Sequence, residues 1–183
     1  MRMEKVLEER IEIPGGTDVS IEWPSVKVKG PKGTLQREFK GPMLRFFEME
    51  KKGNEIVIRS SYNRRKMRAM IGTIRAHIRN MIGGVTEGYV YKMKIHYVHF
   101  PITMEIKGDK IIVKNFLGER TIRKTSIVGK TKVEQKKDDI VITGIDKEDV
   151  AQTAANIENS CRLSRKDRRT FLDGIYITEK DAR

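Results

Sequence analysis

Hydrophobic and polar residues alternate along short segments of the first third of the chain, a pattern that predicts half-buried β-strands. Val26 and Val28, for example, alternate with Lys27 and Lys29, and the run 30–34 (GPKGT) that follows predicts a tight hairpin turn. The strands predicted in this region cover residues 19–23, 26–29, 35–39 and 56–58.

A different period begins after Tyr62 and predicts a helix. Apolar residues recur there at the i, i+3, i+4 and i+7 spacing of an amphipathic helix, namely Met67, Met70, Ile71, Ile74, Ile78, Met81 and Ile82. We expect this helix to cover residues 64–82, with its methionine-rich stripe packed in the core. Gly83 and Gly84 are expected to end it, because glycine readily adopts the left-handed conformation of a helix C-cap.

The second half of the chain repeats this order of elements. A helical pattern begins near Asp146 or Lys147 and extends through Cys161. It is preceded by strand-like segments at 91–97, 102–106, 111–113, 120–122 and 140–142.

Matched positions in the two halves indicate a tandem duplication. The offsets between matched residues are nearly constant, at 85 (Val28 to Val113), 84 (Ile56 to Ile140) and 83 (Met67 to Val150). The sequence therefore predicts the α+β class, as two copies of a small antiparallel sheet covered by one helix. We place the first domain at residues 1–83, with its helix at 64–82, and the second at residues 84–183.

Composition points to a polyanionic partner. The 183 residues include 38 Lys and Arg against 25 Asp and Glu, which gives a net charge of +13. A disulfide-bonded secreted scaffold is excluded, because Cys161 is the one cysteine. The chain opens without the apolar core of a signal peptide, and no apolar run approaches the roughly 20 residues of a membrane span. We therefore expect a cytoplasmic protein.

The two predicted helices differ in charge. From Ser60 to Thr86 the chain carries six Lys or Arg and no acidic residue, whereas the second helix carries Lys147 against Asp146, Glu148, Asp149 and Glu158. A duplicated scaffold with different surfaces implies different surroundings for each copy. The basic helix either faces phosphates or is an ordinary solvated basic face.

The strongest concentration of charge follows the second helix. Between Ser160 and Leu172 one acidic residue stands against five cations, Arg162, Arg165, Lys166, Arg168 and Arg169. The planar fork of arginine matches phosphate oxygens, and Phe171 or Tyr176 could stack on a base or pack on the protein. Lys92 and Lys94 alternate with apolar neighbours and share one strand face. The alternative is a charged tail that makes no contact.

No catalytic or metal-binding motif is present. The chain lacks a phosphate-binding GxxxxGK[ST] loop, paired-cysteine zinc spacing and HExxH. We expect no metal, no cofactor and no small-molecule substrate. A metal-dependent nucleic-acid-processing enzyme using Asp138, Asp139 and a histidine is one rival interpretation. A protein that binds an anionic membrane through its basic helix is another.

Several strings resemble the large-subunit ribosomal protein of the universal L-six family, in its archaeal and eukaryotic form (L-nine in eukaryotes). They are 99–102 (HFPI), 114–119 (KNFLGE), 166–169 (KDRR) and 171–176 (FLDGIY), with support from Ile13-Pro14 and the turn at 28–33. The resemblance covers essentially the whole chain.

This resemblance implies two similar α+β domains without enzymatic activity. It implies a structural constituent of the large ribosomal subunit in the cytoplasm, which binds large-subunit rRNA near the stalk base and the translational GTPase-binding region and supports subunit assembly and translation. The implied partners are rRNA and neighbouring ribosomal proteins at the stalk base, with no membrane. RNA contact in the family is made mainly by the second domain. The site residues that we expect are Arg162, Arg165, Lys166, Arg168, Arg169, Gly174, Tyr176 and His99, with Lys92 and Lys94 from the strand pattern.

Overall fold

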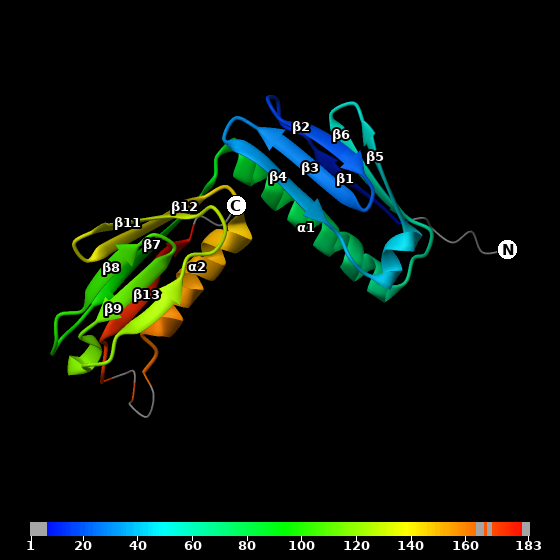
Figure 1. The fold of residues 1–183 in the computed structure, drawn as a ribbon. Coiled ribbons are helices and arrows are strands. Elements are labelled where there is room, and N and C mark those ends of the chain that lie inside the picture. The colour runs from blue at the N-terminus through cyan, green and yellow to red at the C-terminus, as the bar shows by residue number, and fades with distance from the viewer. Residues whose placement is uncertain (1–6, 164–166, 168–169, 181–183) are drawn as a thin grey trace. The chain divides into compact units, whose positions relative to one another are not determined.

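The chain folds into two compact units in the computed structural model, Met1–Glu87 and Gly88–Arg183 (Figure 1). The structure describes residues 7–163, 167 and 170–180. We had placed the boundary after residue 83, whereas the two units divide after Glu87. The difference arises because the first helix continues past Gly83 and Gly84 to Thr86.

The first unit contains two antiparallel sheets and one long helix. One sheet has the strand order β1-β6-β5 and the other β2-β3-β4. The elements are β1 (Leu7–Glu12), β2 (Asp18–Glu22), β3 (Ser25–Gly30), β4 (Gly33–Glu38), the short 3-10 helix η1 (Pro42–Phe46), β5 (Phe47–Lys52), β6 (Glu55–Ser60) and α1 (Arg65–Thr86).

The second unit has the same plan with one further strand. Its sheets have the orders β10-β9-β8 and β11-β12-β7-β13. The elements are β7 (Tyr89–His96), β8 (Thr103–Lys107), β9 (Lys110–Lys114), the 3-10 helix η2 (Phe116–Gly118), β10 (Arg123–Ser126), β11 (Lys132–Lys136), β12 (Asp139–Gly144), α2 (Lys147–Ser160) and β13 (Gly174–Lys180).

The strand orders confirm the α+β class and the duplication. Strand β3 is the middle strand of its sheet, and β9 has the same place in the second unit. Strand β6 lies between β1 and β5, as β12 lies between β7 and β11. Each unit holds two sheets where we had expected one. The strand predicted at 120–122 is wrong, since these residues precede β10, which begins at Arg123.

Tertiary contacts explain why α1 runs past its two glycines. Val85, in the last turn, is completely buried, and its carbonyl oxygen accepts a hydrogen bond of 2.9 Å from the backbone N–H of Lys32. The β3–β4 hairpin therefore packs on this turn and holds it in the helix. A Cβ atom at Gly30 would lie 2.7 Å from the Val85 Cγ2 atom, so the hairpin needs glycine there. The left-handed residue that follows the helix is Gly88, with φ 74°.

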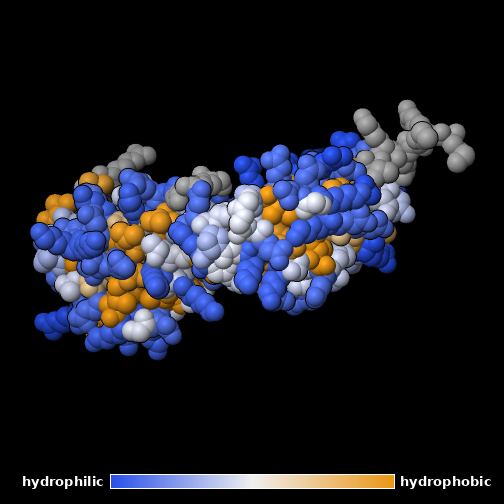
Figure 2. All heavy atoms as spheres, turned by 90° about the horizontal axis from the view of Figure 1, so that it is seen from above, coloured by the Kyte–Doolittle hydropathy of each residue, from blue (hydrophilic) through white to orange (hydrophobic). Residues whose placement is uncertain are grey.

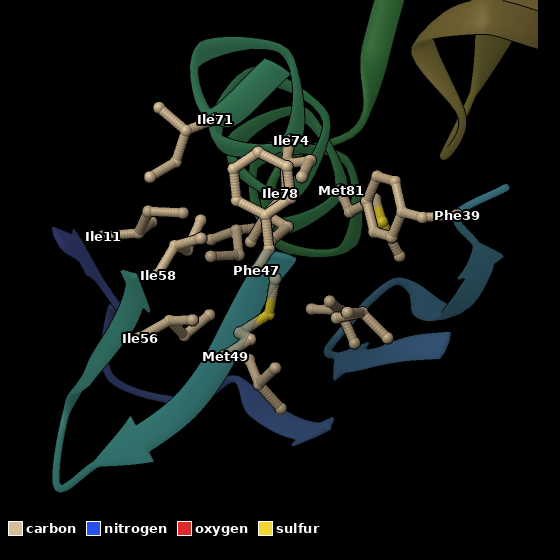
Figure 3. Close-up of a cluster of buried hydrophobic side chains, with 14 of the residues drawn as sticks. Ile11, Phe39, Phe47, Met49, Ile56, Ile58, Ile71, Ile74, Ile78 and Met81 are labelled. Carbon is tan, nitrogen blue, oxygen red and sulfur yellow. The ribbon is translucent and has the colours of Figure 1, made fainter. Parts of the chain in front are cut away.

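The apolar stripe of α1 lies in the core of the first unit, as its spacing predicted. Ile71, Ile74, Ile78 and Met81 come together with strand residues such as Ile58 in Figure 3. Met67 and Met81 of this stripe are buried, and the half-buried Met70 packs against the same core. The opposite side of the helix is exposed, and hydrophilic residues cover much of the visible surface of both units in Figure 2.

Helix α2 covers the core of the second unit and follows the usual rules for a helix start. The side chain of Asp146 caps it by accepting a hydrogen bond of 2.9 Å from the backbone N–H of Glu148. Glu148 and Asp149 lie in the first turn, at the positive end of the helix dipole. Cys161 is buried beyond the last turn, and burial raises the pKa of its thiol, as expected for a small core residue.

Gly72, in the middle of α1, stands at an exposed position where a Cβ atom would meet nothing within 4 Å. We expect Gly72→Ala to raise the free energy of unfolding by about 0.5–1 kcal/mol, because alanine loses less backbone entropy in a helix. Denaturant unfolding measures this change. The matched control is Ala155→Gly in α2, which should lower stability by a similar amount. A loss of stability in Gly72→Ala would show that an unseen contact requires glycine.

Candidate RNA interface

The outer face of the sheet β11-β12-β7-β13 presents the two lysines singled out from the strand pattern. Along β7, Tyr91, Met93 and Ile95 are buried, while Lys92 and Lys94 between them are exposed. Both lysines therefore lie on the solvent side of one strand, as the alternation predicted. The inner side of the strand belongs to the core that α2 covers.

Strand β13 places the predicted residues Gly174 and Tyr176 beside these lysines. It pairs antiparallel with β7, with Gly174 opposite His96 and Tyr176 opposite Lys94. Residues directly opposite each other in an antiparallel pair share a face of the sheet. The half-buried ring of Tyr176 thus lies next to the ammonium-bearing side chain of Lys94 on the exposed face.

The two lysines differ in their partners. The Lys92 ammonium lies 2.6 Å from a carboxylate oxygen of Glu179, and this hydrogen bond raises the pKa of Lys92. Within the part of the chain that the structure describes, Lys94 has no ion-pair partner. Lys94 is consequently the more available of the two cations for an external anion.

Glycine at position 174 is required by the ring of Tyr176. A Cβ atom there would lie 2.9 Å from the ring Cζ and Oη atoms of Tyr176, which is closer than real Cβ contacts. The Tyr176 hydroxyl group donates to the carbonyl oxygen of Asp173 over 3.4 Å, which also holds the ring toward this end of the strand. The close approach of ring and backbone fixes the place of the aromatic face beside Lys94.

Replacement of Gly174 by alanine is expected to cost about 1–2 kcal/mol of stability, because the new methyl group displaces the Tyr176 ring. The double variant Gly174→Ala/Tyr176→Ala should lose less than the sum of the two single variants, since the clash is then absent. Denaturant unfolding of all four proteins gives this coupling as a double-mutant cycle. Strict additivity would show that ring and methyl group do not meet.

The loop after β7 is anchored by a carboxylate that the sequence did not single out. Asp173 is completely buried, and its Oδ1 atom accepts hydrogen bonds from the backbone N–H groups of Val98 (2.8 Å) and His99 (3.4 Å). The Nδ1 atom of His99 lies 3.4 Å from its other carboxylate oxygen. The burial of Asp173 depends on a pairing between segments about 75 residues apart, which no local pattern reveals.

The pKa of Asp173 is set by two opposing effects. Burial alone raises the pKa of this carboxyl group, but the hydrogen bonds from Val98 and His99 stabilise the charged form and bring the pKa below its usual value. The carboxylate is therefore ionised at neutral pH and holds the loop as an acceptor.

Three of the strings that carried the resemblance meet at this loop. Phe100 of the string 99–102 packs over Gly118, where a Cβ atom would lie 3.2 Å from the ring. The Asn115 side chain donates to the carbonyl oxygen of Pro101 over 3.0 Å. Asp173, from the string 171–176, holds the same loop through its hydrogen bonds to Val98 and His99. The strings 99–102, 114–119 and 171–176 are therefore in contact with one another at this loop.

The loop exposes apolar and aromatic side chains that composition alone did not reveal. Tyr97, Val98 and Phe100 are exposed to 42%, 64% and 45%, and Leu172 to 52%. The ring of His99 lies 6.1 Å from that of Phe171, so the two rings are neighbours. Unstacked RNA bases can stack on exposed aromatic rings of this kind.

Arg162 is exposed just beyond α2, at the start of the basic segment. Arg123, by contrast, makes its contacts within the protein. It donates to the Ser160 carbonyl oxygen over 2.8 Å, pairs with Glu119 and lies 4.3 Å from the centre of the Phe116 ring. This cation satisfies the C-terminal end of α2 and fixes the start of the segment.

Four of the predicted contact residues lie outside the described residues, namely Arg165, Lys166, Arg168 and Arg169. The structure does describe both sides of this run, Arg162 before it and Phe171 to Tyr176 after it. In the described ranges, no three His, Cys, Asp or Glu side chains are grouped so that they could hold a metal ion. Neither described helix is long and apolar enough to cross a membrane.

Comparison with known proteins shows similarity over nearly the whole chain. The family model for ribosomal protein L6 matches twice, at residues 13–88 and 100–174, one match in each unit. Large ribosomal subunit protein uL6 of Aeropyrum pernix is 47% identical over 176 residues, which are 94% of this chain and 94% of that protein. The uL6 proteins of Methanocella arvoryzae (46% identical; 98% and 99% covered) and Methanothrix thermoacetophila (49% identical; 93% and 96% covered) are similarly close. The chain belongs to the ribosomal protein L6 family.

Proposed function

We propose that the chain is a structural constituent of the large ribosomal subunit in the cytoplasm and that it binds large-subunit rRNA through its second unit. Membership of a ribosomal protein family gives it a structural role in the ribosome and not an enzymatic one. The similar archaeal proteins are named as large-subunit proteins, which supports the same subunit and an archaeal type for this chain.

One arrangement carries the proposal of RNA binding. Lys94 and Tyr176 lie side by side on the exposed face of the four-stranded sheet, and the loop 97–101 with its exposed rings is tied to the same C-terminal segment. This segment also carries the run of five cations between Ser160 and Leu172. Cations bind phosphates and aromatic faces bind bases, so one surface supplies both kinds of contact.

The mechanism of binding that follows is electrostatic. Lysine and arginine side chains replace counterions on the RNA phosphates, and the folded sheet and its anchored loop hold those side chains in fixed positions. Gly174 contributes by allowing the Tyr176 ring to lie where it does, and His99 by its exposed place on the loop. The released counterions make affinity fall as salt concentration rises.

The place within the subunit is part of the proposal. The resemblance implies contact with rRNA near the stalk base and the translational GTPase-binding region, beside neighbouring ribosomal proteins. A protein held there supports subunit assembly and translation through position and not through chemistry of its own.

The direct test combines two measurements on the full chain. The tagged protein should co-sediment with large subunits in a sucrose gradient of cell extract. The purified protein should bind deproteinised large-subunit rRNA with a log affinity that falls linearly with log salt. Lys94→Gln/Tyr176→Ala should lower this affinity, while Lys27→Gln/Gln36→Ala, at an exposed pair on facing strands of the first unit, should not. Absence from the large subunit, or affinity independent of salt, would overturn the proposal.

A further inference from the structure

Gly72 lies at the centre of a group of arginines on the exposed side of α1. On a helix surface, the neighbours of a residue stand three, four and seven positions away. For Gly72 these neighbours are Arg68 and Arg75, with Arg65 and Arg79 one further turn away in each direction. All five residues are exposed, and no contact within the unit requires glycine at position 72.

These arginines are incompletely neutralised by the protein itself. Arg75 donates to a carboxylate oxygen of Glu9 over 3.0 Å, and Arg68 binds the neutral side chain of an asparagine. Among the residues that the structure describes, Arg65 and Arg79 have neither an ion pair nor a side-chain hydrogen bond. Like charges spaced in this way repel each other, so the group is unfavourable unless an anion is present.

The start of α1 adds further positive charge. Arg64, Arg65 and Lys66 occupy the N-cap and the first turn, where no side chain caps the helix and no acidic residue lies. The helix dipole makes this end positive as well, and cations there destabilise the helix. The Arg64 guanidinium packs over the Tyr62 ring, 5.8 Å from its centre, but no carboxylate among the described residues pairs with Arg64, Arg65 or Lys66.

Helix α2 serves as an internal control, because it occupies the same place in the duplicated unit. At the matched positions, 83 residues later, Glu148 replaces Arg65, Ala155 replaces Gly72 and Glu158 replaces Arg75. Helix α2 also has a side-chain cap and acidic residues in its first turn. The fold of the unit therefore does not require the clustered arginines, the glycine in mid-helix or the uncapped basic start of α1. Each of these three features lowers the stability of that helix.

We propose that the α1 surface, defined as Arg65, Arg68, Gly72, Arg75 and Arg79, binds the phosphate backbone of an RNA segment as a second contact. It extends over about 21 Å of helix. The missing side chain at Gly72 lets a backbone approach the helix closely between the arginine forks. The surface has no large apolar residue that could anchor a protein partner, which favours RNA. The inference rests on the proposed rRNA-binding role and gives the first unit a contact of its own.

The test measures binding of the full chain to deproteinised large-subunit rRNA over a range of salt concentrations. In the variant Arg65→Gln/Arg79→Gln the salt slope should fall by about 1.5 and the affinity at 0.15 M salt roughly 20-fold. Arg10→Gln/Lys52→Gln removes the same charge from the β1-β6-β5 sheet of the same unit and should change affinity less than about 2-fold. Gly72→Leu should lower affinity without lowering thermal stability, because it blocks close approach and leaves the charge unchanged.

The outcomes separate this inference from the proposed function. Equal behaviour of Arg65→Gln/Arg79→Gln and its control would overturn the α1 contact, while salt-dependent binding by the unaltered chain would leave the role of the second unit intact. The α1 contact with RNA would also be overturned if Arg65→Gln/Arg79→Gln failed to enter large subunits but still bound bare rRNA with unchanged affinity. The partner of the α1 surface would then be an acidic protein surface. Binding by the unaltered chain that ignores salt would instead refute the proposed function.

Discussion

Replacing Arg165, Lys166, Arg168 and Arg169 by glutamine is expected to lower affinity for large-subunit rRNA by two to three orders of magnitude at 0.15 M salt, roughly 300-fold. Each phosphate contact contributes a little under one unit to the slope of log affinity against log salt, so four lost contacts reduce that slope by about 3. In the sequence the four residues lie between Arg162 and strand β13, the strand that carries Tyr176.

A matched variant distinguishes this loss from a general effect of charge. Replacing Arg10, Lys27, Lys51 and Lys52 by glutamine removes the same net charge from strands of the first unit, outside the α1 surface. Its affinity should stay within several-fold of the unaltered chain. Filter binding or fluorescence anisotropy over a salt series gives both slopes. Equal losses in the two variants would mean that the basic segment makes no specific contact.

Asp173→Ala is expected to lower the free energy of unfolding by about 3 kcal/mol, because it removes a buried carboxylate that accepts from two backbone N–H groups. The loop 97–101 loses its anchor, so RNA affinity should fall as well. Asp173→Asn keeps the size of the side chain but supplies a donor where the loop offers donors, and it should also destabilise. Denaturant unfolding measures both variants, and a change below about 0.5 kcal/mol would contradict the anchoring role.

The same carboxylate predicts a pH dependence. Its folded-state pKa lies below the ordinary value of 3.8, so the stability it contributes is fully present above pH 4 and is lost as pH falls through the lower folded pKa. In this acid range, stability should fall more steeply in the unaltered chain than in Asp173→Asn. Parallel curves for the two proteins would show that the carboxyl group is not stabilised in the folded state.

Periodicity predicted the helices and the middle strands well, for a physical reason. The α1 stripe and the middle strands β6 and β12 carry apolar residues that face the core, and burial leaves a clear pattern in the sequence. The outer strands β1 and β5 were not predicted, because charged residues occupy most of their positions. The end of α1 was placed too early, since Val85 is held by a hairpin that is distant in sequence.

The candidate site was predictable in part. The pattern of β7 placed Lys92 and Lys94 on one exposed face, and the structure describes them there. The sequence could not place Tyr176 beside Lys94, because the pairing of β13 with β7 joins segments about 80 residues apart. For the same reason the sequence did not reveal that Asp173 anchors the loop or that Arg123 makes internal contacts. The contacts of Arg162 and of the basic run stay predictions.

Crosslinking from Tyr176 inside assembled large subunits tests the central claim most directly. A photoreactive phenylalanine analogue at position 176, with the crosslinked RNA positions read by reverse transcription, reports what lies beside the sheet face. The same analogue at Gln36, an exposed residue of the β2-β3-β4 sheet in the first unit, serves as control. The account predicts strong crosslinks from position 176 to one region of large-subunit rRNA. Crosslinks from this position to proteins alone, or a chain that never enters the subunit, would contradict it.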